Sequence, residues 1–169
     1  MAPVPWRDWL SHRESLTARL VAHCGVFQVQ CLHQRVANAM QDECQTLQLS
    51  VPGKVHERDV LLLCDGQPVV YAHSVLPLQA TAQQWPLFAT LGNRSLGTIL
   101  FQDPLVRRGP LHYARLRQGH PLARRITAMQ LPASPPSNLL ARRSLFIRKG
   151  VPLLVTEVFL PSLATLFRP

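Results

Sequence analysis

The segment HERDVLLLCDGQPVVYAHSVLP, residues 56–77, decides the fold class. Two apolar runs rich in strand-forming residues flank the dipeptide Asp65-Gly66, which is the strongest short signal for a β-hairpin with a two-residue turn. Because strand side chains alternate between faces, Arg58 stands at the start of an otherwise apolar row. The other members of that row are Val60, Leu62 and Cys64.

A second hairpin is predicted in RRSLFIRKGVPLLVTEVFLP, residues 142–161, with its turn near Lys149-Gly150. Its last strand also carries one charge, Glu157, on an apolar face. A buried charge without a partner is very costly, so this carboxylate and Arg58 each need one. The apolar members of the Glu157 face are Leu153, Val155 and Phe159.

The two charges allow two interpretations. In the first, Arg58 and Glu157 pair with each other or reach solvent at strand ends. In the second, both line an apolar cavity that holds a charged ligand. Arg58 then binds an acid through two parallel hydrogen bonds, and Glu157 meets a hydroxyl group or takes a proton. Small-molecule sites are usually apolar with a few convergent polar groups.

The remaining segments complete an α+β fold. Because the strands come as hairpins without crossover helices, we expect a mostly antiparallel sheet with helices over one face. A capping box from Ser11 to Glu14 precedes a predicted helix that Gly25 ends. Further strands are predicted at 26–36 and 111–119, helices at 15–24, 81–92 and 95–101, and a proline-containing loop at 119–138, while 37–54 shows no clear pattern.

The segment LGNRSLG, residues 91–97, has glycines on both sides of Ser95. Ser95 is placed to cap the helix that follows, and a plain cap is the simpler interpretation. Free backbone N–H groups at such a helix start can also bind a carboxylate.

Length and composition indicate one globular domain. The chain has 169 residues, of which 47% are hydrophobic and 16% are charged. No stretch approaches the roughly 20 apolar residues of a membrane span, and the first ten residues lack the apolar core of a signal peptide. We therefore expect a cytoplasmic protein that does not insert into membranes.

The net charge of +9 would suit nucleic acid, anionic lipid or small anions. The arginines are scattered and aromatic residues make up only 7% of the chain, so we expect no nucleic-acid partner. The four cysteines lack C-x-x-C spacing and are expected to be buried free thiols. The seven histidines form no helical H-x-x-x-H pair, so no metal site is predicted.

Three segments together resemble the chorismate lyase family. Their specific features are an arginine that opens a DG hairpin, an L-G-x-x-x-L-G motif, and L-L-x-T-E-x-F-L-P near the end. SLTARL at 15–20 also resembles the N-terminal helix segment of that family, whereas 1–14, 37–54 and 119–138 match weakly. The three segments are RDVLLLCDGQPVVYAHSVLP (58–77), LGNRSLGTILF (91–101) and RRSLFIRKGVPLLVTEVFLP (142–161).

The resemblance implies a single domain over 1–169, in which an antiparallel sheet and helices enclose a ligand cavity. It implies the conversion of chorismate to 4-hydroxybenzoate and pyruvate, the first committed step toward the ubiquinone ring. It also implies that no metal and no organic cofactor take part and that the product is held tightly. The partners expected from it are the substrate chorismate and the product 4-hydroxybenzoate.

The resemblance also implies roles for particular residues. Arg58 binds the ring carboxylate together with the backbone N–H groups of Leu16 and Leu96, and Glu157 lies near the ring hydroxyl. The chain departs from the family at His73, where an arginine is usual. We expect His73 to face the ligand region, where a neutral histidine would loosen the grip on the substrate or ease product release. Leu16 replaces a methionine, which a backbone contact tolerates.

Effector-sensing domains of bacterial transcription regulators share this fold and catalyse nothing. The fold segments begin almost at Met1, so we expect no DNA-binding domain ahead of them. This favours an enzyme over a non-catalytic domain that binds a small aromatic acid. We also expect a monomer, because no second apolar face is evident.

Overall fold

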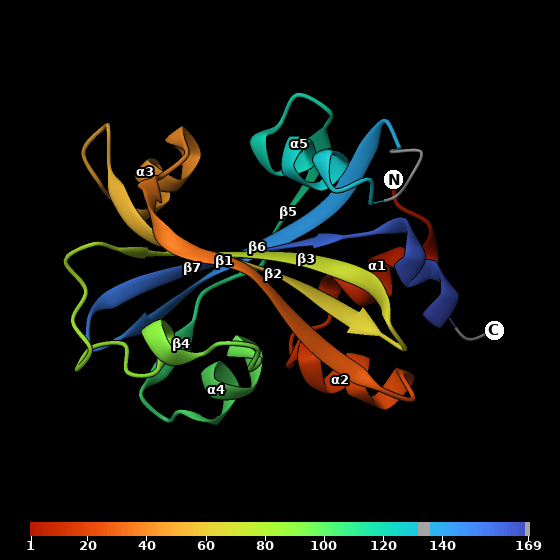
Figure 1. Cartoon of the computed structure of the whole chain (residues 1–169), viewed down its shortest axis with the longest axis horizontal. Helices are drawn as coiled ribbons and strands as arrows, with labels where there is room; N and C mark the ends of the chain where they lie inside the picture. Colours follow the sequence, from red (N-terminus) through yellow and green to blue (C-terminus); the bar gives the residue numbers. More distant parts are fainter. Residues whose placement is uncertain (132–135, 168–169) are drawn as a thin grey trace.

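The computed structural model describes residues 1–131 and 136–167. All strand pairs are antiparallel within one seven-stranded sheet, in the order β1-β2-β3-β7-β6-β4, with β5 also paired to β6. The expected α+β fold is confirmed (Figure 1). The strands are β1 (Phe27–Asn38), β2 (Lys54–Cys64), β3 (Gln67–Pro77), β4 (Val106–Arg108), β5 (His112–Arg117), β6 (Asn138–Arg148) and β7 (Val151–Phe159).

The helices cover both faces of the sheet, not one as predicted. In Figure 1, α2 and α4 lie along one side of the sheet, and α3 and α5 lie along the other. Among the described residues, no helix is long and apolar enough to cross a membrane. The helices are α1 (Val4–Ser11), α2 (Leu16–His23), α3 (Gln41–Leu47), α4 (Leu96–Gln102) and α5 (Pro121–Ala128), with 3-10 turns at Phe88–Thr90 and Pro161–Leu166.

Both predicted hairpins are confirmed. Asp65 and Gly66 have φ values of 51° and 79°, and Lys149 and Gly150 have values of 49° and 75°. A two-residue turn with positive φ at both positions matches the twist of the flanking strands. The glycine in each pair is therefore required by the backbone conformation.

The core is divided by the sheet. On the α2 and α4 side, Leu20 and Leu100 belong to two hydrophobic clusters that rest on the sheet. On the other side, Ile126 of α5 and Leu47 of α3 anchor two more clusters. The predicted strand faces are confirmed, because the apolar rows that begin at Arg58 and surround Glu157 both lie on the α2 and α4 side.

Several local predictions were wrong. Residues 4–11, for which no helix was predicted, form α1. Helix α2 is capped by Ser15, whose hydroxyl accepts from the Ala18 N–H at 3.2 Å, so the predicted capping box at Ser11 is not used. Turns and one 3-10 turn replace the helix predicted at 81–92, because Pro86 interrupts it.

The segments without a regular pattern also contain helices. The polar stretch 37–54 contains α3, and the predicted loop 119–138 contains α5, which has proline at its first position. Residues 132–135 of that loop lie outside the described residues.

The cysteine prediction was wrong for one pair. Cys24 and Cys64 form a disulfide, with Cα atoms 5.3 Å apart, while Cys31 and Cys44 are free and only Cys44 of these two is buried. The end of α2 and the end of β2 lie close enough for this bond, which residue spacing alone did not indicate.

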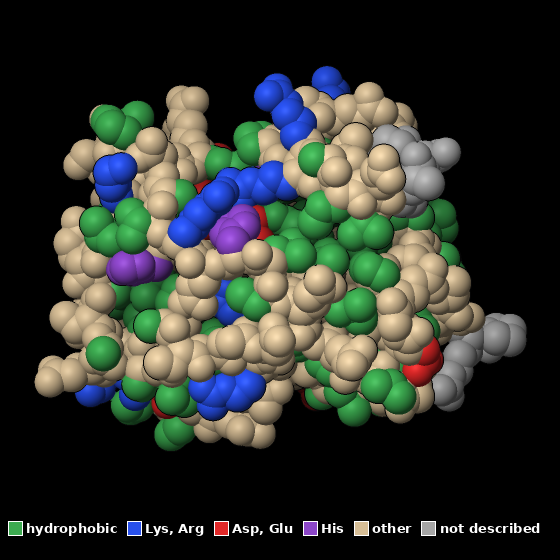
Figure 2. Space-filling model, viewed as in Figure 1, with side chains coloured by type: hydrophobic (Ala, Val, Ile, Leu, Met, Phe, Trp, Pro, Cys, Tyr) green, Lys and Arg blue, Asp and Glu red, His purple; other side chains and the backbone are tan. Residues whose placement is uncertain are grey.

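Basic side chains on the face in view form several separate groups between neutral and hydrophobic ones (Figure 2). This distribution agrees with the scattered arginines of the sequence.

Candidate active site

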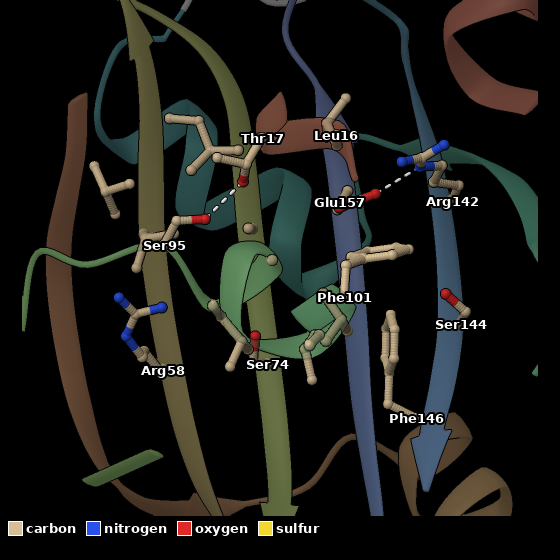
Figure 3. Close-up of a pocket in the computed structure, with 18 of the residues that line it drawn as sticks. Leu16, Thr17, Arg58, Ser74, Ser95, Phe101, Arg142, Ser144, Phe146 and Glu157 are labelled. Carbon is tan, nitrogen blue, oxygen red and sulfur yellow. Dashed lines mark hydrogen bonds and ion pairs between the residues drawn. The ribbon is translucent and has the colours of Figure 1, made fainter. Parts of the chain in front are cut away.

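A mostly apolar cavity lies on the α2 and α4 side of the sheet, between the two hydrophobic clusters (Figure 3). Its floor comes from the inner faces of β1, β2, β3, β7 and β6, and its cover from the first turn of α2 and from α4. The charged residues that line it are Arg58, Arg108, Arg142 and Glu157. The two predicted charges therefore line the same cavity.

Arg58 lies at the β2 side of the cavity and is only 2% exposed. One terminal nitrogen, Nη2, donates to the carbonyls of Gly92 at 3.0 Å and Arg94 at 2.8 Å. Its Nε atom is buried without a hydrogen-bond partner among the described residues. Burial lowers the pKa of this guanidinium, and the nearby Cys31 opposes that shift. This cation is therefore buried, and its hydrogen bonds with residues 1–131 and 136–167 go to neutral groups.

Glu157 lies on the other side of the cavity and pairs with Arg142 of the neighbouring strand, not with Arg58. Arg142 Nε is 2.5 Å from Glu157 Oε2. The Nη1 atom of Arg142 also donates to the carbonyls of Trp9, Leu10 and His12 near the end of α1. The first interpretation is therefore wrong in its pairing of Arg58 with Glu157, and Arg58 is too deeply buried to reach solvent instead. In Figure 3 the Arg142–Glu157 pair lies across the cavity from Arg58.

Arg108 reaches the cavity from β4. Its Nε donates to Ser144 Oγ at 3.0 Å, and its Nη1 donates to the backbone carbonyl of Arg13. Its guanidinium carbon lies 5.2 Å and 5.4 Å from the ring centroids of Phe101 and Phe146. Burial lowers the pKa of Arg108, while the Glu157 carboxylate opposes the shift. Neither Arg108 nor Arg142 was predicted from the sequence as a cavity residue.

The starts of α2 and α4 meet above the cavity. Leu16 and Leu96 are the first residues of these helices, where N–H groups have no acceptor within the helix. Ser95 is the N-cap residue, as predicted, but its hydroxyl bonds Thr17 Oγ1 at 2.6 Å and does not cap the helix (Figure 3). A Cβ atom at Gly97 would lie 2.9 Å from Thr17 Oγ1, so glycine permits this close approach.

His73 does not face this cavity, contrary to the prediction. A β-bulge between Leu62 and Leu63 leaves Val69 of β3 unpaired. The shift pairs Arg58 with Ser74 and moves His73 to the opposite face of the sheet. Ser74 lines the cavity in its place.

On that opposite face, His73 lies inside a buried ionic network. Its Nδ1 is 2.5 Å from Asp59 Oδ1, and its Nε2 is 2.7 Å from Glu43 Oε1. Burial alone would lower the pKa of His73, but the hydrogen bonds to these two carboxylates outweigh it and raise the pKa to about 9. The imidazole is therefore charged at neutral pH and cannot act as the neutral group that was expected.

One part of this network has the ligand types of a metal site. Atoms of His33, Glu57 and Asp59 lie within 4.8 Å of one another. However, Arg35 Nε is 2.9 Å from Glu57 Oε1, and Arg125 Nη1 is 2.7 Å from Asp59 Oδ2. Because guanidinium groups already neutralise both carboxylates, the geometry favours an ion-pair network over a bound cation.

Solved structures share the fold. The effector domain of PhnF from Mycobacterium smegmatis matches with a TM-score of 0.60 and 16% identity, covering 88% of this chain and 90% of that one. A GntR-family transcriptional regulator from Bacillus cereus matches with a TM-score of 0.55 and 13% identity, covering 80% of this chain and 92% of that one. Similarity at this level of identity establishes the fold alone.

Proteins found by sequence similarity have a much higher identity to this chain than these solved structures have. The "Probable chorismate pyruvate-lyase" of Nitrosomonas eutropha is 47% identical over 162 residues, 96% of this chain and 90% of the relative. The protein of the same name in Nitrosomonas europaea is 42% identical over 165 residues, 98% of this chain and 92% of the relative. The family model for chorismate lyase matches residues 1–168. The chain therefore belongs to the chorismate lyase family.

Proposed function

We propose that this protein is a chorismate pyruvate-lyase, which converts chorismate to 4-hydroxybenzoate and pyruvate. One observation carries the proposal. The buried guanidinium of Arg58 has no carboxylate partner among the described residues, and it faces Glu157 across an apolar cavity. A cation held only by neutral groups in a dry site is suited to bind an acid.

The cavity fits a ring with an acid at one end and a hydroxyl at the other. Strand β3 lies between the strands that carry Arg58 and Glu157, so the backbones of those strands are about 10 Å apart. We propose that Arg58 binds the ring carboxylate, with the N–H groups of Leu16 and Leu96 as further donors. Glu157 then accepts a hydrogen bond from the hydroxyl on ring carbon C4, because Arg142 fixes its other oxygen.

The reaction breaks the bond between ring carbon C3 and the ether oxygen, and it removes the hydrogen on C4. The ring becomes aromatic, and the departing enolpyruvyl group gains a proton on its methylene carbon to become pyruvate. Aromatisation supplies the driving force, so the protein needs mainly to position and polarise the substrate. Arg58 stabilises the charge that is pushed onto the ring carboxylate.

Two routes for the proton fit this site. Glu157 could take the C4 proton as a general base. Alternatively, the proton could pass directly from C4 to the enolpyruvyl methylene in a cyclic step, so that the cavity selects only the reactive conformer. The Glu157→Gln variant discussed below separates these routes.

We further propose that residues 1–169 form one domain that acts as a cytoplasmic monomer without a cofactor. In this proposal its product enters ubiquinone synthesis. A single continuous sheet, to which every described strand belongs, supports the one-domain view. Size-exclusion chromatography with light scattering measures the oligomeric state directly, and a mass of about one chain, 19.0 kDa, is expected.

The second candidate is a non-catalytic domain that binds a small aromatic acid. The similarity in fold to the PhnF effector domain favours it, although that similarity does not extend to sequence. Such a domain would bind 4-hydroxybenzoate and leave chorismate unchanged.

The test mixes the purified protein with chorismate and measures 4-hydroxybenzoate and pyruvate separately. We expect equimolar amounts of both. Arg58→Met keeps the length of the side chain but removes its hydrogen bonds, and should lower kcat/KM by about 100-fold or more. Arg107→Met changes the adjacent, exposed position on β4 and should leave kcat/KM unchanged.

The outcomes separate the two candidates. Binding of 4-hydroxybenzoate without turnover of chorismate would identify a sensing domain. An absence of both turnover and binding would leave the cavity residues with structural roles only.

A further inference from the structure

We infer that Arg108 binds the second carboxylate of the substrate, the one on the enolpyruvyl side chain, and thereby selects a dianion over a single acid. This inference rests on the proposed function, because it concerns the same cavity. Chorismate carries two carboxylates, whereas 4-hydroxybenzoate keeps only the ring carboxylate. Arg58 accounts for the ring carboxylate, so the side-chain carboxylate needs another partner.

The charges that line the cavity point to a dianion. Three arginines and one glutamate face it, and the glutamate is already paired with Arg142. Arg58 and Arg108 have no carboxylate partner among the residues that the structure describes. Two uncompensated positive charges in a largely apolar site favour a ligand with two negative charges.

Within the part of the chain that the structure describes, the hydrogen bonds of Arg108 go to neutral groups. Ser144 Oγ accepts from Nε, the Arg13 carbonyl accepts from Nη1, and the guanidinium carbon lies over the rings of two phenylalanines. These contacts fix the side chain without neutralising it, and Nη2 forms no hydrogen bond with a described residue that would compete with an incoming carboxylate. A guanidinium with a fixed orientation loses less conformational entropy when it binds an acid.

The location of Arg108 matches the shape of the substrate. Ser144, which orients it, lies on β6 beside Arg142, on the opposite side of the cavity from Arg58 (Figure 3). The enolpyruvyl group leaves ring carbon C3, next to the hydroxyl on C4. When the ring carboxylate is on Arg58 and the hydroxyl is on Glu157, the side chain leaves the ring at the Glu157 end of the cavity, which is the side of the sheet where β6 and β4 lie.

The test compares Arg108→Gln with Arg107→Gln, the matched change on the next residue of β4, which is exposed and does not line the cavity. Two quantities are measured, kcat/KM for chorismate and the Kd of 4-hydroxybenzoate by calorimetry. In Arg108→Gln we expect kcat/KM to fall at least about tenfold and the Kd to change by less than about threefold. Arg58→Met should lower kcat/KM for chorismate and also raise the Kd of 4-hydroxybenzoate. Arg107→Gln should change neither quantity.

If Arg108→Gln raises the Kd of 4-hydroxybenzoate by about the same factor as it lowers kcat/KM for chorismate, the inference is overturned, because equal effects would indicate a general loss of the cavity's shape. An unchanged kcat/KM would overturn it as well. Arg108→Lys keeps the charge with different geometry and should recover part of the chorismate effect, and it replaces Arg108→Gln if that variant does not fold. The proposed function fails separately, if the unmodified protein makes no 4-hydroxybenzoate. In that case the Kd of chorismate replaces kcat/KM, and the same comparison still decides the role of Arg108.

Discussion

Arg142 Nε lies 2.5 Å from Glu157 Oε2, so the carboxylate in the cavity is paired before any ligand enters. The same guanidinium holds three backbone carbonyls near the end of α1. Arg142 therefore couples the position of Glu157 to the packing of the N-terminal segment. The charge on the apolar face of β7 is tolerated because its partner comes from the adjacent strand.

Arg142→Met should destabilise the fold strongly. The substitution leaves Glu157 unpaired and three carbonyls without their donor, and breaking a buried ion pair typically costs about 3–5 kcal/mol. Urea denaturation measures the free energy of unfolding. Arg124→Met, at an exposed position on α5, is the matched control and should change stability by less than about 0.5 kcal/mol. Equal effects of the two changes would show that the pair contributes nothing.

Glu157→Gln should reduce kcat by about tenfold, because it weakens one hydrogen bond to the substrate hydroxyl. The side chain keeps its shape, and one of its oxygens is already occupied by Arg142. Single-turnover kinetics on chorismate measures the chemical step directly. A loss of about a thousandfold or more would contradict this prediction and identify Glu157 as the general base. The folded fraction of the variant is checked by circular dichroism, since Arg142 loses its counter-charge.

Gly97→Ala should separate the starts of α2 and α4. The new Cβ would lie 2.9 Å from Thr17 Oγ1, and overpacking of this kind costs about 1–3 kcal/mol. Gly97→Ala should therefore lower the melting temperature in thermal denaturation and raise the Kd of 4-hydroxybenzoate.

Thr17→Ala provides the control for Gly97→Ala, because it removes the atom that would clash. In the Thr17→Ala background, Gly97→Ala should be neutral or stabilising, since alanine favours a helix over glycine by about 1 kcal/mol. If Gly97→Ala costs the same in both backgrounds, the close contact is not the cause.

His73 should make stability depend on pH above neutrality. Its pKa is raised from 6.5 to about 9, so the charged form is favoured in the folded state. The stabilisation is fully present below pH 6.5 and is lost as pH rises through 9. The expected loss is about 3 kcal/mol in the free energy of unfolding.

Urea denaturation at a series of pH values measures this loss. His73→Gln removes the titrating group and should flatten the profile between pH 6.5 and 9. A profile of the same shape in both proteins would assign the dependence to other groups.

Much of the cavity could be predicted from residue patterns alone. Alternation placed Arg58 and Glu157 on apolar strand faces, and both faces line one cavity. The partner of Glu157, which is Arg142, could also have been predicted from the register of the second hairpin. Counting outward from the Lys149-Gly150 turn places Arg142 directly opposite Glu157, as the structure has it. A hairpin with a two-residue turn fixes its own register, so this pairing is local information.

Short helices were harder to predict. α3 and α5 have only seven and eight residues, and helices of this length are stabilised mainly by packing. Leu122 and Ile126 of α5 are buried against the sheet, which supplies that packing. The second helix-covered face was therefore not evident from the sequence.

The sequence by itself determined the two hairpins, their turns and the alternation that buries one charge on each, because these depend on residues close together in the chain. Only the tertiary structure decided which residues accompany Arg58. Counting from the Asp65-Gly66 turn would place His73 opposite Arg58, but the bulge at Val69 shifts β3 by one residue and exchanges its faces. Ser74 consequently enters the cavity, and His73 joins the carboxylates on the other side. Such a shift depends on packing across the whole sheet, which local patterns do not specify.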